Sequence, residues 1–232
     1  LHQPGRRRAE AVTVIEGPAQ IADAAGAGAP LLEVFALDPG DVPAAVAAPV
    51  TLVSEAVLGR MAGTVHPRGP LAVATVPPSA ALRSRDTVVL WDIADPGNAG
   101  AIVRSAAAFG FDVAVTRQAT DVWSPKSVRA AAATQFRTSV IELGDDPLGE
   151  VVAAGLAPLA TVVEGGEDAD RLGVTGPVAL LIGSEAHGLP EPVVGAARSV
   201  TLRLGNDVES LNAAVAAGVM MHHIRSLRRG RR

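Results

Sequence analysis

The sequence of 232 residues contains no cysteine. This absence excludes disulfides, zinc fingers, iron–sulfur clusters and cysteine nucleophiles. The sequence also lacks any apolar run of the roughly 18–20 residues that a membrane-spanning helix needs. The first residues include arginines but no apolar stretch follows them, so they do not resemble a secretory signal. These absences predict a soluble cytoplasmic protein.

Aromatic residues are scarce as well, at 3% of the chain, although 48% of the residues are hydrophobic. Alanine, valine and leucine supply most of that apolar content. A core built from such small aliphatic side chains favours an α/β fold over a β-sandwich, and the chain is long enough for one large domain or two small ones.

The net charge of −4 argues against a general polyanion-binding protein. Arginines nevertheless cluster at both ends, at Arg6, Arg7, Arg8, Arg225, Arg228, Arg229, Arg231 and Arg232. One interpretation is that these clusters bind phosphates. The other is that they are solvated tails, with residues 1–8 forming a disordered basic arm. The charge pattern alone favours the second interpretation.

Several common site motifs are missing. No G-x-G-x-x-G follows a predicted strand, and neither a Walker-type G-x-x-x-x-G-K-[ST] nor a G-x-S-x-G motif occurs. His222 and His223 are adjacent, so on a helix they point to different sides and make a poor metal-binding pair. We therefore predict no metal site.

The pattern of apolar runs predicts two domains. Short strand-like and helix-like segments alternate up to Val76, and Pro77-Pro78 then interrupts the pattern. We expect a small α/β domain over residues 1–78 and a second domain over 79–232, with the linker near 77–85.

The second domain shows short apolar runs separated by helical segments, which predicts a mostly parallel sheet with helices on both faces. The last helix is expected over residues 209–227. It is apolar on nearly every side, so we expect it to be buried all round. One face would meet the sheet and the other a second subunit, which predicts a homodimer.

Two apolar runs near the end, residues 178–182 and 200–204, are each followed by a loop that contains glycine. The carboxyl ends of parallel strands form ligand crevices, and glycine lets the backbone approach a ligand closely. Glu185, Ser210 and Asn212 supply polar groups in these loops. The alternative is that they are helix caps or first-turn residues. The local sequence supports both roles equally for Glu185 and favours the structural role for Ser210 and Asn212.

A third segment, residues 91–112, reads as a strand, a Pro-Gly turn and a helix. Asn98 lies near the start of that helix, and Arg104 lies beyond it. A helix N-terminus and an arginine together can hold a phosphate. Taken alone, however, Asn98 is a helix cap and Arg104 a surface residue. His187, in the loop after residue 182, is either an acid–base group or an exposed side chain, and exposure is favoured.

Taken together, these three segments resemble the SpoU (TrmH-like) family of RNA ribose 2′-O-methyltransferases in the SPOUT superfamily. The N-x-G-a-i-x-R-t-A pattern of the family matches Asn98 to Ala106. An apolar run followed by G-s-E-x-x-G-l matches Leu180 to Leu189, and the S-L-N-x-x-x-A pattern lies within Leu202 to Ala216. The match spans residues 87–228. The first domain more loosely resembles the small ribosomal-protein-like RNA-binding domain of the family.

The resemblance implies a deep trefoil knot, a homodimer with its active sites at the subunit interface, and S-adenosylmethionine as the methyl donor. Residues implied to contact the cofactor are Gly183, Leu202 and Leu211, with Thr161, Ile182 and Ser210 nearby. The implied reaction is methyl transfer to a ribose 2′-hydroxyl. Arg104 corresponds to the proposed base of the family, but a guanidinium stays protonated, so binding the adjacent phosphate and orienting the hydroxyl is the safer role. Asn98, Glu185, Ser210 and Asn212 would fix the substrate and the loops, and no metal is required.

One position departs from the pattern, because the family often has I-P-M where this chain has Leu202-Arg203-Leu204. The flanking apolar residues are kept, so we expect an intact cofactor site. The expected substrate is ribosomal RNA, most plausibly 23S. A tRNA substrate, an antibiotic-resistance methyltransferase and a non-catalytic RNA-binding assembly factor are the alternatives.

Overall fold

The computed structural model describes residues 4–62, 69–206 and 208–229, and its described part forms two compact units. The first unit comprises Leu1–Pro78 and Asp121–Arg137, and the second comprises Ser79–Thr120 and Thr138–Arg232. This division differs from the expected domains in one respect, because we expected residues 121–137 in the second domain. The difference has a physical cause, since Val128 and Ala133 of that segment are buried in the core of the first unit.

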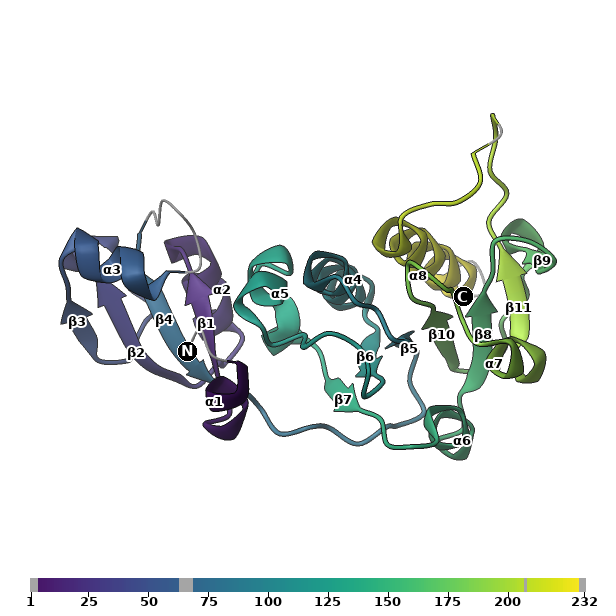
Figure 1. The fold of residues 1–232 in the computed structure, drawn as a ribbon, viewed down its shortest axis with the longest axis horizontal. Coiled ribbons are helices and arrows are strands. Elements are labelled where there is room, and N and C mark those ends of the chain that lie inside the picture. Colours follow the sequence, from purple (N-terminus) through teal and green to yellow (C-terminus); the bar gives the residue numbers. More distant parts are fainter. Residues whose placement is uncertain (1–3, 63–68, 207, 230–232) are drawn as a thin grey trace. The chain divides into compact units, whose positions relative to one another are not determined.

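The first unit contains a four-stranded sheet in the order β1-β4-β2-β3 (Figure 1). Its strands are β1 (Val12–Glu16), β2 (Leu31–Ala36), β3 (Val50–Leu52) and β4 (Leu71–Thr75). The β1–β4 and β4–β2 pairs are antiparallel, and β2–β3 is parallel.

Helices cover both faces of that sheet, because alternate residues of its strands are apolar on both sides. The helices of the unit are α1 (Pro4–Ala9), α2 (Pro18–Gly26), α3 (Glu55–Met61) and α5 (Pro125–Ala130), with 3-10 turns η1 (Pro39–Asp41) and η2 (Thr134–Arg137). One cluster of buried residues joins α2 and α5 to the sheet. A second cluster, around Leu58, joins α3 to its other face.

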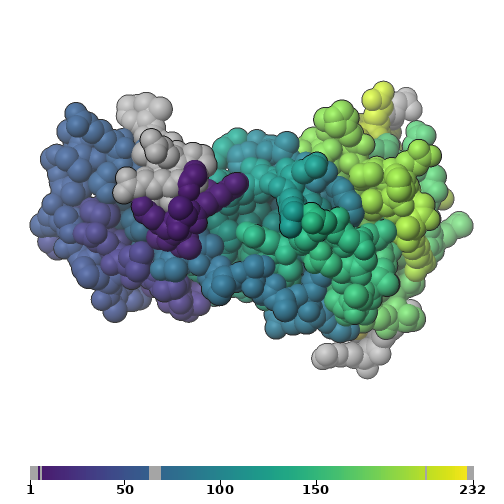
Figure 2. Space-filling model, turned by 60° about the horizontal axis from the view of Figure 1, so that its bottom comes forward, coloured from purple at the N-terminus to yellow at the C-terminus, as the bar shows by residue number. Residues whose placement is uncertain are grey.

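The expectation that residues 1–8 are a disordered arm is wrong for the described residues 4–8. They form most of α1, which lies on the surface of the first unit in Figure 2. Arg7 is only 3% exposed and forms an ion pair with Asp121. Arg7 Nη1 also donates a hydrogen bond to the carbonyl of Trp123 at 3.1 Å. The side chains of Arg6, Arg229, Arg231 and Arg232 lie outside those that the structure describes.

The second unit is built on a seven-stranded sheet in the order β7-β6-β5-β10-β8-β11-β9, and all neighbouring strands in it are parallel. This arrangement confirms the predicted α/β class with a mostly parallel sheet. The strands are β5 (Thr87–Leu90), β6 (Asp112–Val115), β7 (Val140–Glu142), β8 (Ala157–Thr161), β9 (Glu167–Asp168), β10 (Val178–Ile182) and β11 (Arg198–Thr201). The trefoil knot stays a prediction.

Helices α4 (Pro96–Phe109) and α8 (Ala213–Arg229) pack against each other, with α4 on β5 and β6 and α8 on β10. Helices α6 (Pro147–Ala153) and α7 (Glu191–Ala196) contact β8, and α7 also contacts β11; the short η3 (Ala169–Arg171) follows β9. Within a single chain α8 is only partly covered, so the expected burial of its other face by a second subunit stays a prediction. Leu211, just before it, and Val215 and Val219 on it are exposed by 36, 52 and 44%.

Candidate functional site

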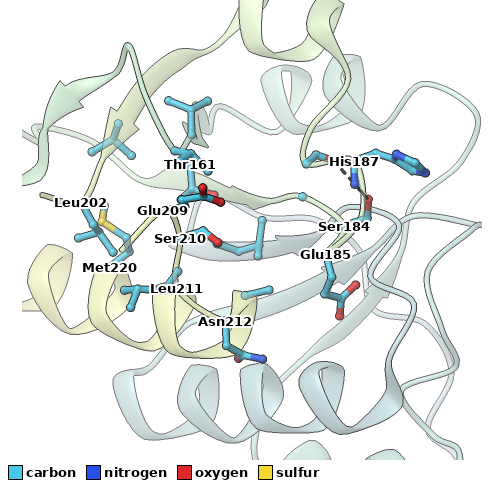
Figure 3. Close-up of a pocket in the computed structure, with 18 of the residues that line it drawn as sticks. Thr161, Ser184, Glu185, His187, Leu202, Glu209, Ser210, Leu211, Asn212 and Met220 are labelled. Carbon is cyan, nitrogen blue, oxygen red and sulfur yellow. Dashed lines mark hydrogen bonds between the residues drawn. The ribbon is translucent and has the colours of Figure 1, made fainter. Parts of the chain in front are cut away.

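A cavity of about 610 Å³ lies where β8, β10 and β11 end and α8 begins. Figure 3 shows Ser184, Glu185 and His187 on one side of it and Leu202, Leu211 and Met220 on the other. Its remaining lining residues are Thr161, Val162, Val163, Ile182, Gly183, Ala186, Gly188, Val200, Leu204, Glu209, Ser210, Asn212, Ala213 and Ala216. The cavity therefore opens at the carboxyl edge of the sheet, as the glycine-bearing strand ends predict.

The loop after β10 is closed on itself by main-chain hydrogen bonds. The amide of Ser184 donates to the carbonyl of Gly188 at 3.2 Å, and the amide of Gly188 donates back at 2.9 Å. Gly183 is required here, because a Cβ at this position would lie 2.3 Å from the carbonyl carbon of Gly188. The glycine thus lets the loop fold against its own strand end and present its backbone to the cavity.

The loop before α8 ends at Asn212, which caps the helix. Its Oδ1 accepts hydrogen bonds from the amides of Ala214 at 2.9 Å and Val215 at 3.3 Å. The helix therefore begins at Ala213 rather than at the expected residue 209. Asn212 is therefore a helix cap, which is one of the two roles that the sequence left open for it.

Asn212 also belongs to a chain of hydrogen bonds that joins the three sequence segments. Its Nδ2 donates to Oδ1 of Asn98 at 2.9 Å, and Nδ2 of Asn98 donates to Oε1 of Glu185 at 2.7 Å. The amide of Ala94 donates to Oε2 of Glu185 at 3.3 Å. Both side-chain amides and the carboxylate thus have partners. These hydrogen bonds fix the start of α4, the loop after β10 and the loop before α8 relative to one another.

The pKa of Glu185 is shifted by two opposing effects. Partial burial raises the pKa, but hydrogen bonds from the side chain of Asn98 and from the amides of Glu185, Ala94 and Asp95 outweigh burial and lower it. Glu185 is therefore a carboxylate at neutral pH. A carboxylate accepts hydrogen bonds and does not donate them, which fits a role in orienting Asn98.

All the residues expected to contact a cofactor, Thr161, Ile182, Gly183, Leu202, Ser210 and Leu211, line this cavity. Its volume lies within the range of about 300–1,000 Å³ that small-molecule sites usually have. The apolar walls suit a planar base, and the glycine-containing backbone and polar side chains offer hydrogen bonds. The chemistry of this lining fits S-adenosylmethionine.

The candidate catalytic residues are not all in the cavity. Glu185, Ser210 and Asn212 line it, and Asn98 lies behind them through the hydrogen bonds described above. Arg104 does not line it; the side chain is exposed on α4 and makes no hydrogen bond or ion pair with the described residues. The arginine is thus free to bind an external anion.

Sequence reasoning missed several residues of the cavity wall. Ala213, Ala216 and Met220 follow the i, i+3, i+7 spacing of one helix face, and that spacing was the available signal. Arg203, which departs from the family pattern, forms an ion pair with Asp168, and its neighbours Leu202 and Leu204 both line the cavity.

Within residues 4–62, 69–206 and 208–229, no three or more His, Asp or Glu side chains come together in a way that could hold a metal ion. Within the same ranges, none of the helices has the length and apolarity that crossing a bilayer requires.

Comparison with known proteins places these features in context. Residues 86–222 match the model of the "SpoU rRNA Methylase family". The chain is 35% identical over 185 residues to an uncharacterized tRNA/rRNA methyltransferase of Synechocystis, covering 75% of this chain but only 66% of that protein. It is 25% identical to the 23S rRNA (guanosine(2553)-2′-O)-methyltransferase RlmP of Bacillus subtilis, covering 97% of this chain and 93% of that one. A crystal structure of an AdoMet-bound rRNA methyltransferase from Sinorhizobium meliloti has a TM-score of 0.85 and 26% identity, covering 97% and 90% of the two chains.

Proposed function

This chain belongs to the SpoU rRNA methylase family, and we propose that it transfers a methyl group from S-adenosylmethionine to a ribose 2′-hydroxyl of ribosomal RNA. The observation that carries the proposal is the meeting of three distant segments at one cavity, joined by the Asn98, Glu185 and Asn212 side chains. The relatives of similar length support the substrate class, since RlmP is by name a 23S rRNA 2′-O-methyltransferase.

In this proposal the cavity holds the cofactor. When bound, S-adenosylmethionine supplies a methyl group on a sulfonium, which moves to the 2′-oxygen as the S–CH₃ bond breaks and the O–CH₃ bond forms. Leu202, Leu211 and Met220 would pack on the apolar parts of the ligand. The backbone at Gly183 and the hydroxyl of Ser210 would accept or donate hydrogen bonds at its polar groups.

Arg104 would bind and orient the RNA. Its guanidinium is exposed and has no partner among the described residues, and a guanidinium binds a phosphate through two parallel hydrogen bonds. Because it stays protonated, it holds the phosphate beside the reacting hydroxyl, and the proton of that hydroxyl passes to solvent. The role of Asn98, Glu185, Ser210 and Asn212 would be to keep the loops and substrate in place.

We further propose a homodimer. Leu211, Val215 and Val219 are spaced by four residues and form an exposed apolar stripe at the start of α8. A second copy that covers this stripe would lie next to the cavity, which Leu211 also lines. Arg104, which lies outside the cavity of its own chain, could then act in the cavity of its partner.

The first unit would bind RNA, and the protein would act in the cytoplasm, where ribosomal RNA is found. A tRNA substrate is the alternative within the same chemistry, and an antibiotic-resistance role is one variant of ribosomal RNA methylation. A non-catalytic assembly factor is the alternative outside it. The complete set of polar side chains around the cavity favours an enzyme.

The test is transfer of labelled methyl from S-adenosylmethionine to RNA from cells that lack this protein, separated into ribosomal and tRNA fractions. Label in ribosomal RNA that resists alkaline cleavage at the modified position is the expected result, since a 2′-O-methyl group blocks that cleavage. Label in tRNA alone would establish the alternative substrate. Binding of the cofactor without label in either fraction would support the assembly factor.

A further inference from the structure

One wall of the cavity is formed by the segment that follows β11. Leu202 and Leu204 line the cavity, but Arg203 between them does not. The Arg203 side chain is 72% exposed, and its Nε forms an ion pair with Oδ2 of Asp168. The segment therefore presents its two leucines to the cavity and its arginine to a neighbouring element.

Asp168 is a fixed anchor for that contact. It ends β9 and pairs with Thr201 in the register between β9 and β11. Its side chain is only 14% exposed, and its other oxygen, Oδ1, accepts a hydrogen bond from the amide of Asp170 at 3.1 Å. Both carboxylate oxygens are thus held, so the aspartate can restrain the exposed arginine.

No regular secondary structure restrains residues 202–205 themselves. The cavity wall would otherwise depend on the packing of two leucines, of which Leu204 is 37% exposed. An ion pair at the residue between them fixes the backbone to which both are attached. The contact therefore acts on the backbone that carries both leucines of this wall.

We propose that the Arg203–Asp168 ion pair is a positioning device that holds the Leu202–Leu204 wall of the cavity in the conformation that binds the cofactor. Both residues act through the leucines and touch no reacting atom. The part of this inference that concerns S-adenosylmethionine rests on the proposed function, whereas the restraint of the wall does not.

Charge signs separate this inference from a simple electrostatic effect. S-adenosylmethionine carries a net positive charge at neutral pH. If Arg203 and Asp168 acted only through their fields, removing the arginine would strengthen cofactor binding and removing the aspartate would weaken it. A positioning pair predicts instead that both removals weaken binding, and that the double variant is no weaker than either single variant.

The variants are Arg203→Met, which keeps an unbranched stem but removes the charged guanidinium, Asp168→Asn, which keeps an acceptor for the amide of Asp170, and their combination. The chain offers a matched control on the same two strands. Arg198 of β11 forms an ion pair with Glu167 of β9, at side-chain exposures of 48 and 35%, and neither residue lines the cavity. Arg198→Met and Glu167→Gln each remove an ion pair away from the wall, and Arg198→Met also removes the hydrogen bond from Nη1 to the carbonyl of Gly173 at 2.7 Å.

The first readout needs no cofactor. NMR order parameters of the Leu202 and Leu204 methyl groups report their motion on the picosecond to nanosecond timescale. We expect these values to fall in Arg203→Met and in Asp168→Asn, and to stay unchanged in both control variants. Unchanged order parameters in the wall variants would overturn the inference, and so would an equal fall in the controls.

The second readout is the dissociation constant of S-adenosylmethionine, measured by calorimetry. An increase of about three- to fivefold is expected for each wall variant and for their combination, the size of effect that a partly exposed ion pair can exert. Opposite shifts for the two single variants would replace positioning by a field effect. If the wild-type protein binds no S-adenosylmethionine, the proposed function fails, and the methyl order parameters still decide whether the pair restrains the wall.

Discussion

Arg7 in the first unit and Arg104 in the second differ in how the protein treats their charge. In the first, Arg7 is 3% exposed and its guanidinium is paired with Asp121. In the second, Arg104 is exposed and has no partner among the described residues. For each arginine the sequence offered phosphate binding as one interpretation and a solvated surface position as the other. The comparison teaches that an arginine whose charge is already satisfied inside the protein serves stability, whereas an exposed arginine without a partner among the described residues is available to a ligand.

The largest effect that would test this comparison is expected at Arg104. Arg104→Ala should lower the rate of methyl transfer by about 10²- to 10³-fold, the usual cost of losing one group that stabilises the transition state. The affinity for S-adenosylmethionine should remain nearly unchanged, because Arg104 does not line the cavity. Single-turnover rates and cofactor titrations measure the two quantities separately.

Arg171, also exposed in the second unit, provides the matched control. Arg171→Ala should leave the rate within about twofold, as surface substitutions remote from a site usually do. Equal losses of rate and cofactor affinity in Arg104→Ala would contradict the assigned role. A methylation rate that survives the substitution would remove Arg104 from the mechanism.

The next effect concerns the folding of the first unit. Arg7→Met should lower its free energy of unfolding by about 2–4 kcal/mol, because Asp121, at 16% exposure, would lose its main partner. Arg8 contacts the same carboxylate oxygen at 3.2 Å but is 65% exposed, so Arg8→Met should cost less than about 1 kcal/mol.

The chain allows the two units to be followed separately, since its two tryptophans lie in different units. Trp123 is in the first unit and Trp91 in the second, at 7 and 8% exposure. Urea unfolding followed in a Trp91→Phe background therefore reports the first unit. Equal destabilisation by Arg7→Met and Arg8→Met would show that burial does not distinguish the two pairs.

The cavity was largely predictable from the sequence, because its signals are local. An apolar run that stops at glycine marks a strand end, and the ends of parallel strands meet at one edge of the sheet. All the residues expected to contact a cofactor line one cavity for this reason. The chain of hydrogen bonds from Asn212 to Glu185 was not predictable in detail, because it joins residues up to 114 positions apart.

The errors arose where long-range packing decides the outcome. Residues 4–8 read as a charged tail, and the partner that buries Arg7 lies 114 residues away. Residues 121–137 follow the strand–helix pattern of the second unit, but Val128 and Phe136 pack in the first. Deletion of residues 1–78 would therefore leave that segment without its core, so RNA binding by the first unit is better tested with single surface substitutions.

The smallest expected effect concerns the pKa values of two carboxylates, Asp121 in the first unit and Glu185 in the second. Burial raises the pKa of Asp121, but the Arg7 guanidinium, the amide of Trp123 and Arg8 lower it overall. The pKa of Glu185 is lowered by neutral donors, chiefly Asn98, against partial burial. Both carboxylates thus have folded-state pKa values below their ordinary values of 3.8 and 4.5.

A lowered folded-state pKa stabilises the folded protein above the ordinary pKa, and this contribution is lost as the pH falls through the folded value. Glu185→Gln should therefore reduce the pH dependence of the second unit's stability below pH 4.5, measured by urea unfolding in a Trp123→Phe background. Added salt should weaken the acid-sensitive contribution of Asp121, whose main partner is a cation, more than that of Glu185, whose donors are neutral. Equal salt sensitivity would mean that Glu185 also interacts with a cation, and would revise its role as the acceptor that orients Asn98.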